Sequence, residues 1–231
     1  MKKLFTILTV VALTTTTSFA QFSVKAGLNM ANIVSNDDDS DNGMKLGMII
    51  GANYNAEISD AMSLDVSVAF KQSGTKQTAS ESSGVVTVDQ SMTYALNYID
   101  ISPSLSFNLS DAMSLSVGPY LAFAMSGKIT AEQTISGTGT NMDGTTSESE
   151  SIKFGDGDDD DGIKSMDFGI NIGTTYSIND AMSVSAGYAL GLTNLSYIDS
   201  DMEDFYDLIN EDPPSIKNSG IFLTFGYTFG G

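Results

Sequence analysis

The chain has 231 residues, enough for one domain of ordinary size, and a formal net charge of −19. All ten of its basic residues are lysines, and this acidic balance excludes nucleic acid as an expected partner. Cysteine and histidine are both absent, which excludes a small secreted domain held by disulfides and any site that depends on an imidazole group.

The N-terminal segment has the pattern of a secretory signal. Two lysines precede an apolar run over residues 4–13, and a small-x-small sequence ends at Ala20. The run is too short to span a bilayer as a helix, which takes about 20 residues. We therefore predict a signal peptide over residues 1–20, cleaved near Ala20, and a single domain over residues 21–231.

One short phrase, Asp-Ala-Met-Ser, recurs three times and begins at Asp60, Asp111 and Asp180. Each copy follows a serine or asparagine and lies between two segments of alternating polarity. Such side chains bond the local backbone in tight turns, and the copies are too unevenly spaced for a solenoid. The phrase therefore predicts three tight hairpin turns.

Period-two alternation marks the remaining strands, and one of the two faces is almost continuously apolar. The other face is small and polar, with Ile49, Tyr120 and Phe222 as its only bulky apolar or aromatic members. A soluble sandwich or barrel would place its large apolar residues inside, whereas a barrel in lipid places them outside. The pattern predicts an all-β fold, an eight-stranded antiparallel transmembrane β-barrel of the outer-membrane type. The apolar faces span residues 22–30, 46–58, 64–70, 99–109, 115–125, 166–178, 184–192 and 221–229.

The three tight turns alternate with four longer connections, near residues 35–43, 72–91, 127–163 and 195–218. Both termini then lie on the side of the short turns, which we expect to be periplasmic. We expect the longer connections to be extracellular loops, and they contain most of the 29 acidic residues. Aromatic residues near the periplasmic strand ends predict an interfacial girdle. Its members are Phe22, Tyr54, Phe107, Tyr176, Tyr227 and Phe229.

Two adjacent strands carry motifs of a known family. A strand that runs from Tyr98 through an acidic residue to Pro103 precedes a strand with Gly118, Pro119 and Tyr120. Together with the opening segment at residues 24–29, these motifs resemble the PorT-type outer-membrane β-barrel family. The resemblance implies a small outer-membrane barrel. It also implies an alternative function, as a component of a protein-secretion or outer-membrane assembly machine.

The sequence gives little support for an enzyme or an open channel. Known small outer-membrane barrel enzymes depend on histidine, and no serine has a candidate base at a recognisable spacing. Eight strands enclose an interior that side chains can fill. The predicted inward charges are balanced in sign, which favours internal pairing and a filled, non-conducting lumen, with a narrow channel as a third alternative. These charges are Lys25, Lys45, Glu57, Asp65, Lys71, Asp100, Lys128 and Asp167.

Three of the inward charges are predicted to form a cluster near the periplasmic end. If Ile58 pairs with Leu64 across the first turn, Glu57 faces Asp65 inside the barrel, and like charges opposed on one face destabilise each other. Lys25 on the neighbouring first strand is then the expected neutralising partner.

Two aspartate-rich runs lie in the predicted loops, and they resemble no ordered calcium site. The second run approaches an EF-hand phrase, but Asp161 stands at the glycine position and no glutamate follows at the required distance. We expect no cofactor, and only weak, diffuse binding of Ca²⁺ or Mg²⁺. The residues concerned are Asp37, Asp38, Asp39, Asp41, Asp156, Asp158, Asp159, Asp160 and Asp161.

The leading hypothesis is a non-enzymatic outer-membrane barrel that contributes to envelope structure, or to surface interaction and adhesion, through its acidic loops. The expected partners are the lipid bilayer, lipopolysaccharide and surface proteins that contact the loops. A monomer is expected.

Overall fold

The computed structural model describes residues 20–36, 43–137, 139, 143–155, 162–197, 200–209 and 211–229. The predicted signal peptide lies outside the described residues except for Ala20, which is the first residue of a strand and pairs with Ala56. Both aspartate runs, Asp37 to Asp41 and Asp156 to Asp161, also lie outside the described residues.

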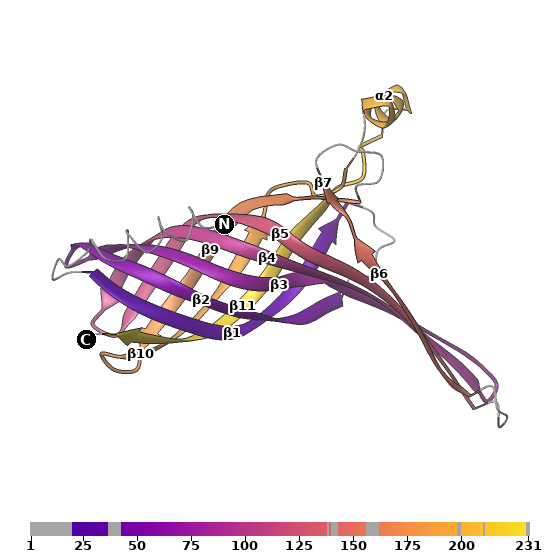
Figure 1. Cartoon of the computed structure of the whole chain (residues 1–231), viewed down its shortest axis with the longest axis horizontal. Helices are drawn as coiled ribbons and strands as arrows, with labels where there is room; N and C mark the ends of the chain where they lie inside the picture. The colour runs from indigo at the N-terminus through magenta and orange to yellow at the C-terminus, as the bar shows by residue number, and fades with distance from the viewer. Residues whose placement is uncertain are drawn as a thin grey trace, which may run out of the picture.

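Eight antiparallel strands form a closed ring, as the alternation predicted (Figure 1). Each strand pairs with its neighbour along the chain, and the pairing of the first strand with the last closes the barrel. Closure leaves no free edge in the ring. The strands are β1 (Ala20–Ser35), β2 (Gly43–Ser59), β3 (Met62–Ser83), β4 (Val86–Ser110), β5 (Met113–Ser136), β9 (Met166–Ser177), β10 (Met182–Gly191) and β11 (Ile216–Phe229).

Tight turns join three pairs of these strands at the predicted phrases. Ser59 pairs with Met62 at the first turn, and Ser110 pairs with Met113 at the second. At the third turn, the side chain of Asn179 accepts hydrogen bonds from the backbone N–H groups of residues 181 and 182. This is the local backbone bonding that the Ser/Asn-Asp pairs predicted.

The outer surface of the ring is apolar, and large aliphatic and aromatic side chains stand on it. Leu46 is 64% exposed, and Ile50 is 54% exposed. Phe22 lies opposite both Tyr54 and Phe229 in the register, and its ring centroid is 5.0 Å from that of Tyr54. The predicted outward faces are therefore confirmed for these positions. No helix in the described part of the chain is both long and apolar enough to cross a membrane.

Two of the predicted loops are instead strands that continue beyond the barrel. β3 and β4 pair without interruption as far as Ser83 and Val86, and β5 pairs with an additional strand, β6 (Gly144–Ile152). The resulting four-stranded sheet, which we call the tongue, comprises residues 74–96, residues 127–136 and β6. It slants away from the barrel in Figure 1. At about 3.3 Å per residue, the ten residues from Gly74 to Ser83 extend about 33 Å.

β3 enters the tongue at a glycine with an unusual backbone conformation. Gly74 has a φ of 119°, and a Cβ atom at this position would lie 1.9 Å from the carbonyl oxygen of Tyr94. Only glycine adopts such a conformation without strain. Gly74 therefore permits β3 to stay paired with β4 where the sheet leaves the barrel.

The other connections contain short elements at the end of the barrel opposite the tight turns. The strands β7 (Phe154–Gly155) and β8 (Ile163–Lys164) form a parallel pair, and the fourth connection contains a helix, α2 (Ser200–Ile209). The prediction of a loop at 195–218 therefore missed a helix. α2 lies far from the tongue in Figure 1, and its Phe205 and Leu208 are exposed.

Candidate functional site in the barrel interior

The interior is built from alternate residues of the ring strands, and glycines make room for its few large side chains. A Cβ atom at Gly169 would lie 2.5 Å from the Tyr120 ring, and one at Gly187 would lie 2.4 Å from the Phe222 ring. Tyr120 is 1% exposed. The two aromatic residues that the alternation placed inside therefore fit into gaps left by inward glycines.

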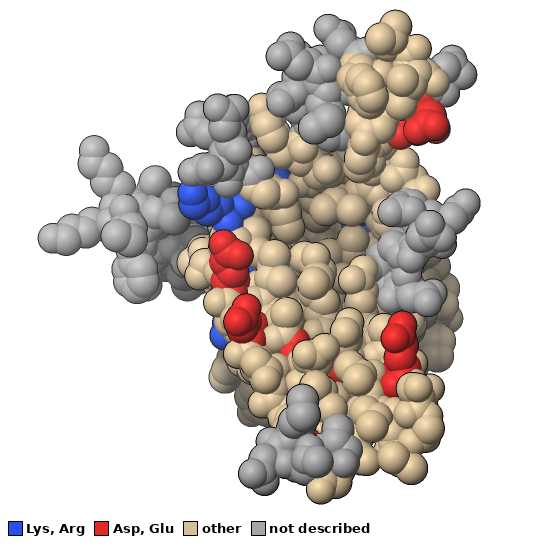
Figure 2. Space-filling view, turned by 90° about the vertical axis from the view of Figure 1, so that its right-hand side faces the viewer, with Lys and Arg blue, Asp and Glu red and all other residues tan. Residues whose placement is uncertain are grey.

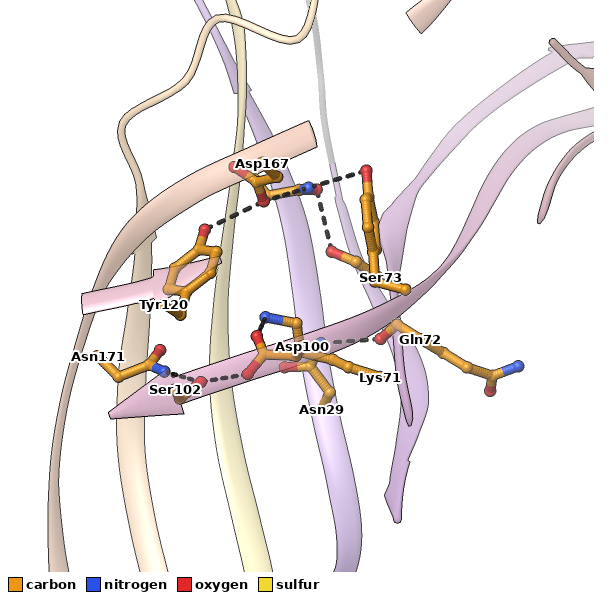
Figure 3. A network of polar contacts seen from close by, with 11 residues as sticks. Asn29, Lys71, Gln72, Ser73, Asp100, Ser102, Tyr120, Asp167 and Asn171 are labelled. Carbon is orange, nitrogen blue, oxygen red and sulfur yellow. Dashed lines mark hydrogen bonds and ion pairs between the residues drawn. The ribbon is translucent and has the colours of Figure 1, made fainter. Parts of the chain in front are cut away.

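A buried ion pair crosses the middle of the lumen (Figure 3). Lys71 Nζ lies 2.7 Å from Asp100 Oδ2, and the two side chains are 12% and 7% exposed. The same ammonium group stands 4.3 Å from the centroid of the Tyr120 ring, within cation–π range. Asp100 also accepts a hydrogen bond from Ser102, which in turn accepts one from Asn171. These contacts join β3, β4, β5 and β9 across the barrel.

A second part of the network surrounds a buried carboxylate. Asp167 accepts hydrogen bonds from Tyr120 Oη at 3.1 Å and from Asn218 Nδ2 at 2.9 Å, while its Oδ1 atom has no partner. Asn218 also donates to Tyr98 Oη and accepts a bond from Ser73. Because buried polar groups are costly to leave unpaired, this network holds five strands of the ring in one arrangement.

On the side of this network away from the tight turns, apolar residues close the barrel. Leu195, from the fourth connection, is fully buried, and Ile163 of β8 is 6% exposed. The backbone of Leu195 accepts a hydrogen bond from Lys164 and donates one to Ile216. Connections between strands thus form the upper part of the core. The buried cluster contains Ile33, Leu96, Tyr98, Tyr120, Ala122, Ile163, Ala189 and Leu195.

On the side of the tight turns, the interior is a polar cavity of ≈ 380 Å³, which we call the vestibule. Its walls are mainly serine, threonine and asparagine, and turn residues such as Asn179 and Asp180 line its mouth. The space tapers to a cavity of ≈ 50 Å³ bounded by Lys71 and Asp100. Lys25 lines both cavities. The lumen is therefore a well that opens at the turn side and ends at the ion pair.

The register corrects the prediction that Glu57 faces Asp65. Ser59 pairs with Met62, and an irregularity between Glu57 and Ser59 places Asn55 opposite Asp65 and Ser63 opposite Glu57. The turn is thus tighter than the pairing of Ile58 with Leu64 that we expected. Glu57 is exposed at the mouth of the vestibule.

Asp65 is instead surrounded by neutral donors. Asn53 and Asn55 donate to its Oδ1 atom at 3.1 Å and 2.9 Å, and Ser106 donates to Oδ2. Lys25 makes no ion pair with any described residue, although it is attracted by Asp100 and Asp65 and repelled by Lys71. The three predicted members of the cluster all line the vestibule, but the like charges are not opposed.

The other predicted inward charges divide into two groups. Lys45, Lys71, Asp100 and Asp167 belong to the inward-facing positions of the ring, and Lys71 and Asp100 form an internal ion pair. Lys128 was wrongly placed inside. A β-bulge at Met125 reverses the alternation of β5, and Lys128 is exposed on the tongue.

Sequence reasoning missed several members of the network. Asn29 lies inside the barrel and donates to the backbone of Gln72 at 2.8 Å. Its alternation with apolar neighbours in β1 indicated that it faces inward. Ser73 and Asn218 fell in segments that we interpreted as loops. In the described residues no group of three or more acidic, histidine or cysteine side chains is placed to hold a metal ion.

Comparison with known proteins gives a family for this architecture. No curated protein matches the sequence. Similar solved structures include Neisserial surface protein A (13% identity, 91% of this chain and 99% of that chain covered, TM-score 0.48) and Ail of Yersinia pestis (14%, 91% and 99%, 0.42). OprG of Pseudomonas aeruginosa is another (10%, 92% and 97%, 0.36). The model of the outer membrane protein beta-barrel domain matches residues 14–197, so the chain belongs to this family and is an outer-membrane protein.

Proposed function

We propose that the protein is a closed, non-enzymatic barrel that anchors an interaction surface outside the cell. The observation that carries the proposal is the tongue, whose outer part, residues 77–92, extends about 23 Å past the last pairing of β3 with β2 and takes no part in the packing of the barrel. A membrane barrel needs only a closed ring of paired strands. The long, paired extension of the tongue is ordered structure that the ring does not require. Surface interaction and adhesion give this extension a role.

The interior supports the same proposal, because it favours anchoring over transport. A conducting pore needs a continuous water path. The ion pair between Lys71 and Asp100 and the apolar cluster around Leu195 stand in that path. Lipopolysaccharide, with divalent cations at the acidic connections, is the proposed neighbour at the membrane surface, and a monomer is the proposed state.

The direct test is a deletion strain scored separately for adhesion, for secreted protein and for envelope integrity. Complementation uses the wild-type chain and a variant in which a two-residue turn replaces residues 77–92 and another replaces residues 132–147. We expect loss of adhesion on deletion, and recovery only with the wild-type chain. The shortened variant must be shown to reach the outer membrane and to fold. If it restores adhesion fully, the tongue is not the interaction surface.

A second candidate function is a component of a protein-secretion or outer-membrane assembly machine. The resemblance to the PorT-type family at Tyr98, Pro103 and Pro119 supports it, and so does the vestibule, which offers an open mouth lined by polar residues on the side of the tight turns. Loss of secreted protein in the deletion strain, with adhesion and envelope integrity intact, would favour this function over adhesion.

A further inference from the structure

The two faces of the tongue differ in chemistry, and the register defines which residues share a face. On the inner face, which continues the lumen side of the barrel, Met92 of β4 pairs with Ala131 of β5 and Tyr94 pairs with Ile129. On the outer face, Ser91 pairs with Glu132 and Thr93 with Thr130. Directly opposed residues of an antiparallel pair point to the same side. The inner face therefore carries two apolar groups, which the inner-face pair of Gln90 and Gln133 separates. The first group is Met92, Tyr94, Ile129 and Ala131, and the second, nearer the tip, is Val88 and Ile135. We call these six residues together the apolar stripe.

The apolar face of the tongue is the inner one, whereas the apolar face of the barrel is the outer one. Within the ring, the odd-numbered residues of β4, such as Ile101 and Leu105, face outward and are apolar. Beyond Tyr98 the apolar residues of β4 are even-numbered and lie on the inner face. A sheet exposed to water on both sides needs no apolar face, and Met92 is 38% exposed on this one. The exposed stripe is therefore a candidate contact surface.

The charges of the tongue are also segregated between its faces. The inner face has three carboxylates, those of Glu81, Glu148 and Glu150, and no lysine. Both lysines of the tongue, Lys76 and Lys128, lie on the outer face, where two acidic residues balance them. The inner face thus combines an apolar centre with a negative rim. In Figure 2, which views this end of the molecule, acidic side chains flank a broad uncharged surface, with lysine side chains beside them at its upper left edge.

The width of the inner face limits which shape of partner can bind between its rims. Its rims are the outermost strands β3 and β6, and four strands about 4.8 Å apart set these rims about 14 Å from each other. A groove of ≈ 660 Å³ lies between them, lined mainly by inner-face residues that include Met92, Ala131 and Glu148. An α-helix is about 10–12 Å across. One helix therefore fits between the rims with its flanks beside the carboxylates.

We propose that the inner face of the tongue binds a cationic amphipathic helix of another protein. Apolar side chains of that helix cover the stripe around Met92 and Ala131, and basic side chains on its flanks meet Glu81 on one rim and Glu148 and Glu150 on the other. This inference rests on the proposed function in surface interaction and specifies the chemistry of the partner.

The chain has no cysteine, so a single introduced thiol can report binding at one position. Full-length Ala131→Cys, on the inner face, and Thr130→Cys, its neighbour on the outer face, are refolded into zwitterionic phospholipid nanodiscs. The probe is a synthetic leucine–lysine helix of about 22 residues, about 33 Å long and therefore long enough to span the tongue, with an activated terminal disulfide. We expect Ala131→Cys to cross-link faster than Thr130→Cys by about tenfold at equal intrinsic thiol reactivity, because local binding raises the effective concentration.

Charge and sequence controls then test the two parts of the surface. Adding Glu148→Gln and Glu150→Gln should slow the cross-linking of Ala131→Cys by about tenfold, whereas Asp89→Asn and Glu132→Gln on the outer face should change it less than about twofold. A peptide of the same composition in scrambled order should react slowly. Equal rates at the two thiols, an equal effect of the two pairs of substitutions, or fast reaction of the scrambled peptide would each overturn the proposal.

Two further outcomes keep this proposal separate from its alternatives. If lipopolysaccharide-containing bilayers, without peptide, protect Ala131→Cys from a small maleimide, the inner face lies on lipid and the proposal fails. The cross-linking experiment uses no cells. A deletion strain that adheres normally therefore refutes the proposed function in adhesion and leaves the helix-binding proposal untouched. Conversely, lost adhesion with no preference for the inner face refutes only the helix-binding surface.

Discussion

Removal of the Lys71 ammonium group, which pairs with Asp100 in the lumen, should destabilise the barrel. In Lys71→Met the carboxylate of Asp100, 7% exposed, loses a partner at 2.7 Å. Breaking a buried ion pair by removing one member costs about 3–5 kcal/mol. Asp100 keeps its bond from Ser102 and the attraction of Lys25, so we expect a loss of about 3 kcal/mol, at the lower end of this range.

The measurement is the free energy of unfolding in urea, for protein refolded into phospholipid vesicles, with the shift in gel mobility as the readout. Lys76→Met is the matched control, because Lys76 lies on the same strand but is exposed, and its removal should cost less than about 0.5 kcal/mol. Adding Asp100→Asn to Lys71→Met should restore more than half of the loss, since no buried charge is then left unpaired. If Lys71→Met is as stable as Lys76→Met, or if the double variant is no better than the single one, the ion pair is not a structural element.

Four other outcomes are expected. Planar-bilayer recordings of refolded wild-type protein should show no steady conductance, and reproducible single-channel steps would mean that water passes the ion pair. Lys25→Met should change the free energy of unfolding by less than about 1 kcal/mol, because Asp65 keeps three neutral donors; a loss above about 2 kcal/mol would restore the predicted cluster. Gly74→Ala should strain the base of the tongue by about 1–3 kcal/mol and speed tryptic cleavage at Lys76, with the urea midpoint of the barrel unchanged. Calorimetry should detect weak, salt-sensitive Ca²⁺ binding at several sites, and one stoichiometric site of micromolar affinity, lost when residues 156–161 become serine, would contradict this.

The ring could be predicted from sequence because lipid imposes a strict rule on its strands. Outward positions must be mostly apolar, so residues such as Ile50, Ile170 and Leu223 alternate with small polar ones over long stretches. The turns were predictable because Asn179 and the serines at the other two turns have side chains suited to bonding the local backbone.

The tongue could not be predicted in the same way, because water imposes no such rule. Its segments are rich in serine and threonine, which occur in loops as often as in exposed strands, and the apolar residues around Met92 change from odd to even positions.

The network in the lumen depends on register and on distant pairing. Asn218 and Ser73 meet across the barrel only because β3 and β11 curve around the same interior, and no local pattern records that contact.

The β-bulge at Met125 has a consequence for how this chain tolerates changes in length. On β4 the apolar residues change from odd-numbered positions in the barrel to even-numbered positions in the tongue. On β5 they stay odd-numbered from Leu115 to Ile135. The extra residue at the bulge turns these odd-numbered residues of β5 from the outside of the sheet to the inside. Loss of one residue there would send Ile129 and Ala131 to the opposite side of the sheet, out of phase with Tyr94 and Met92. Loss of two adjacent residues would keep Ile129 and Ala131 on the inner face and would only shorten the tongue. Homologous chains should therefore differ at this junction by even numbers of residues.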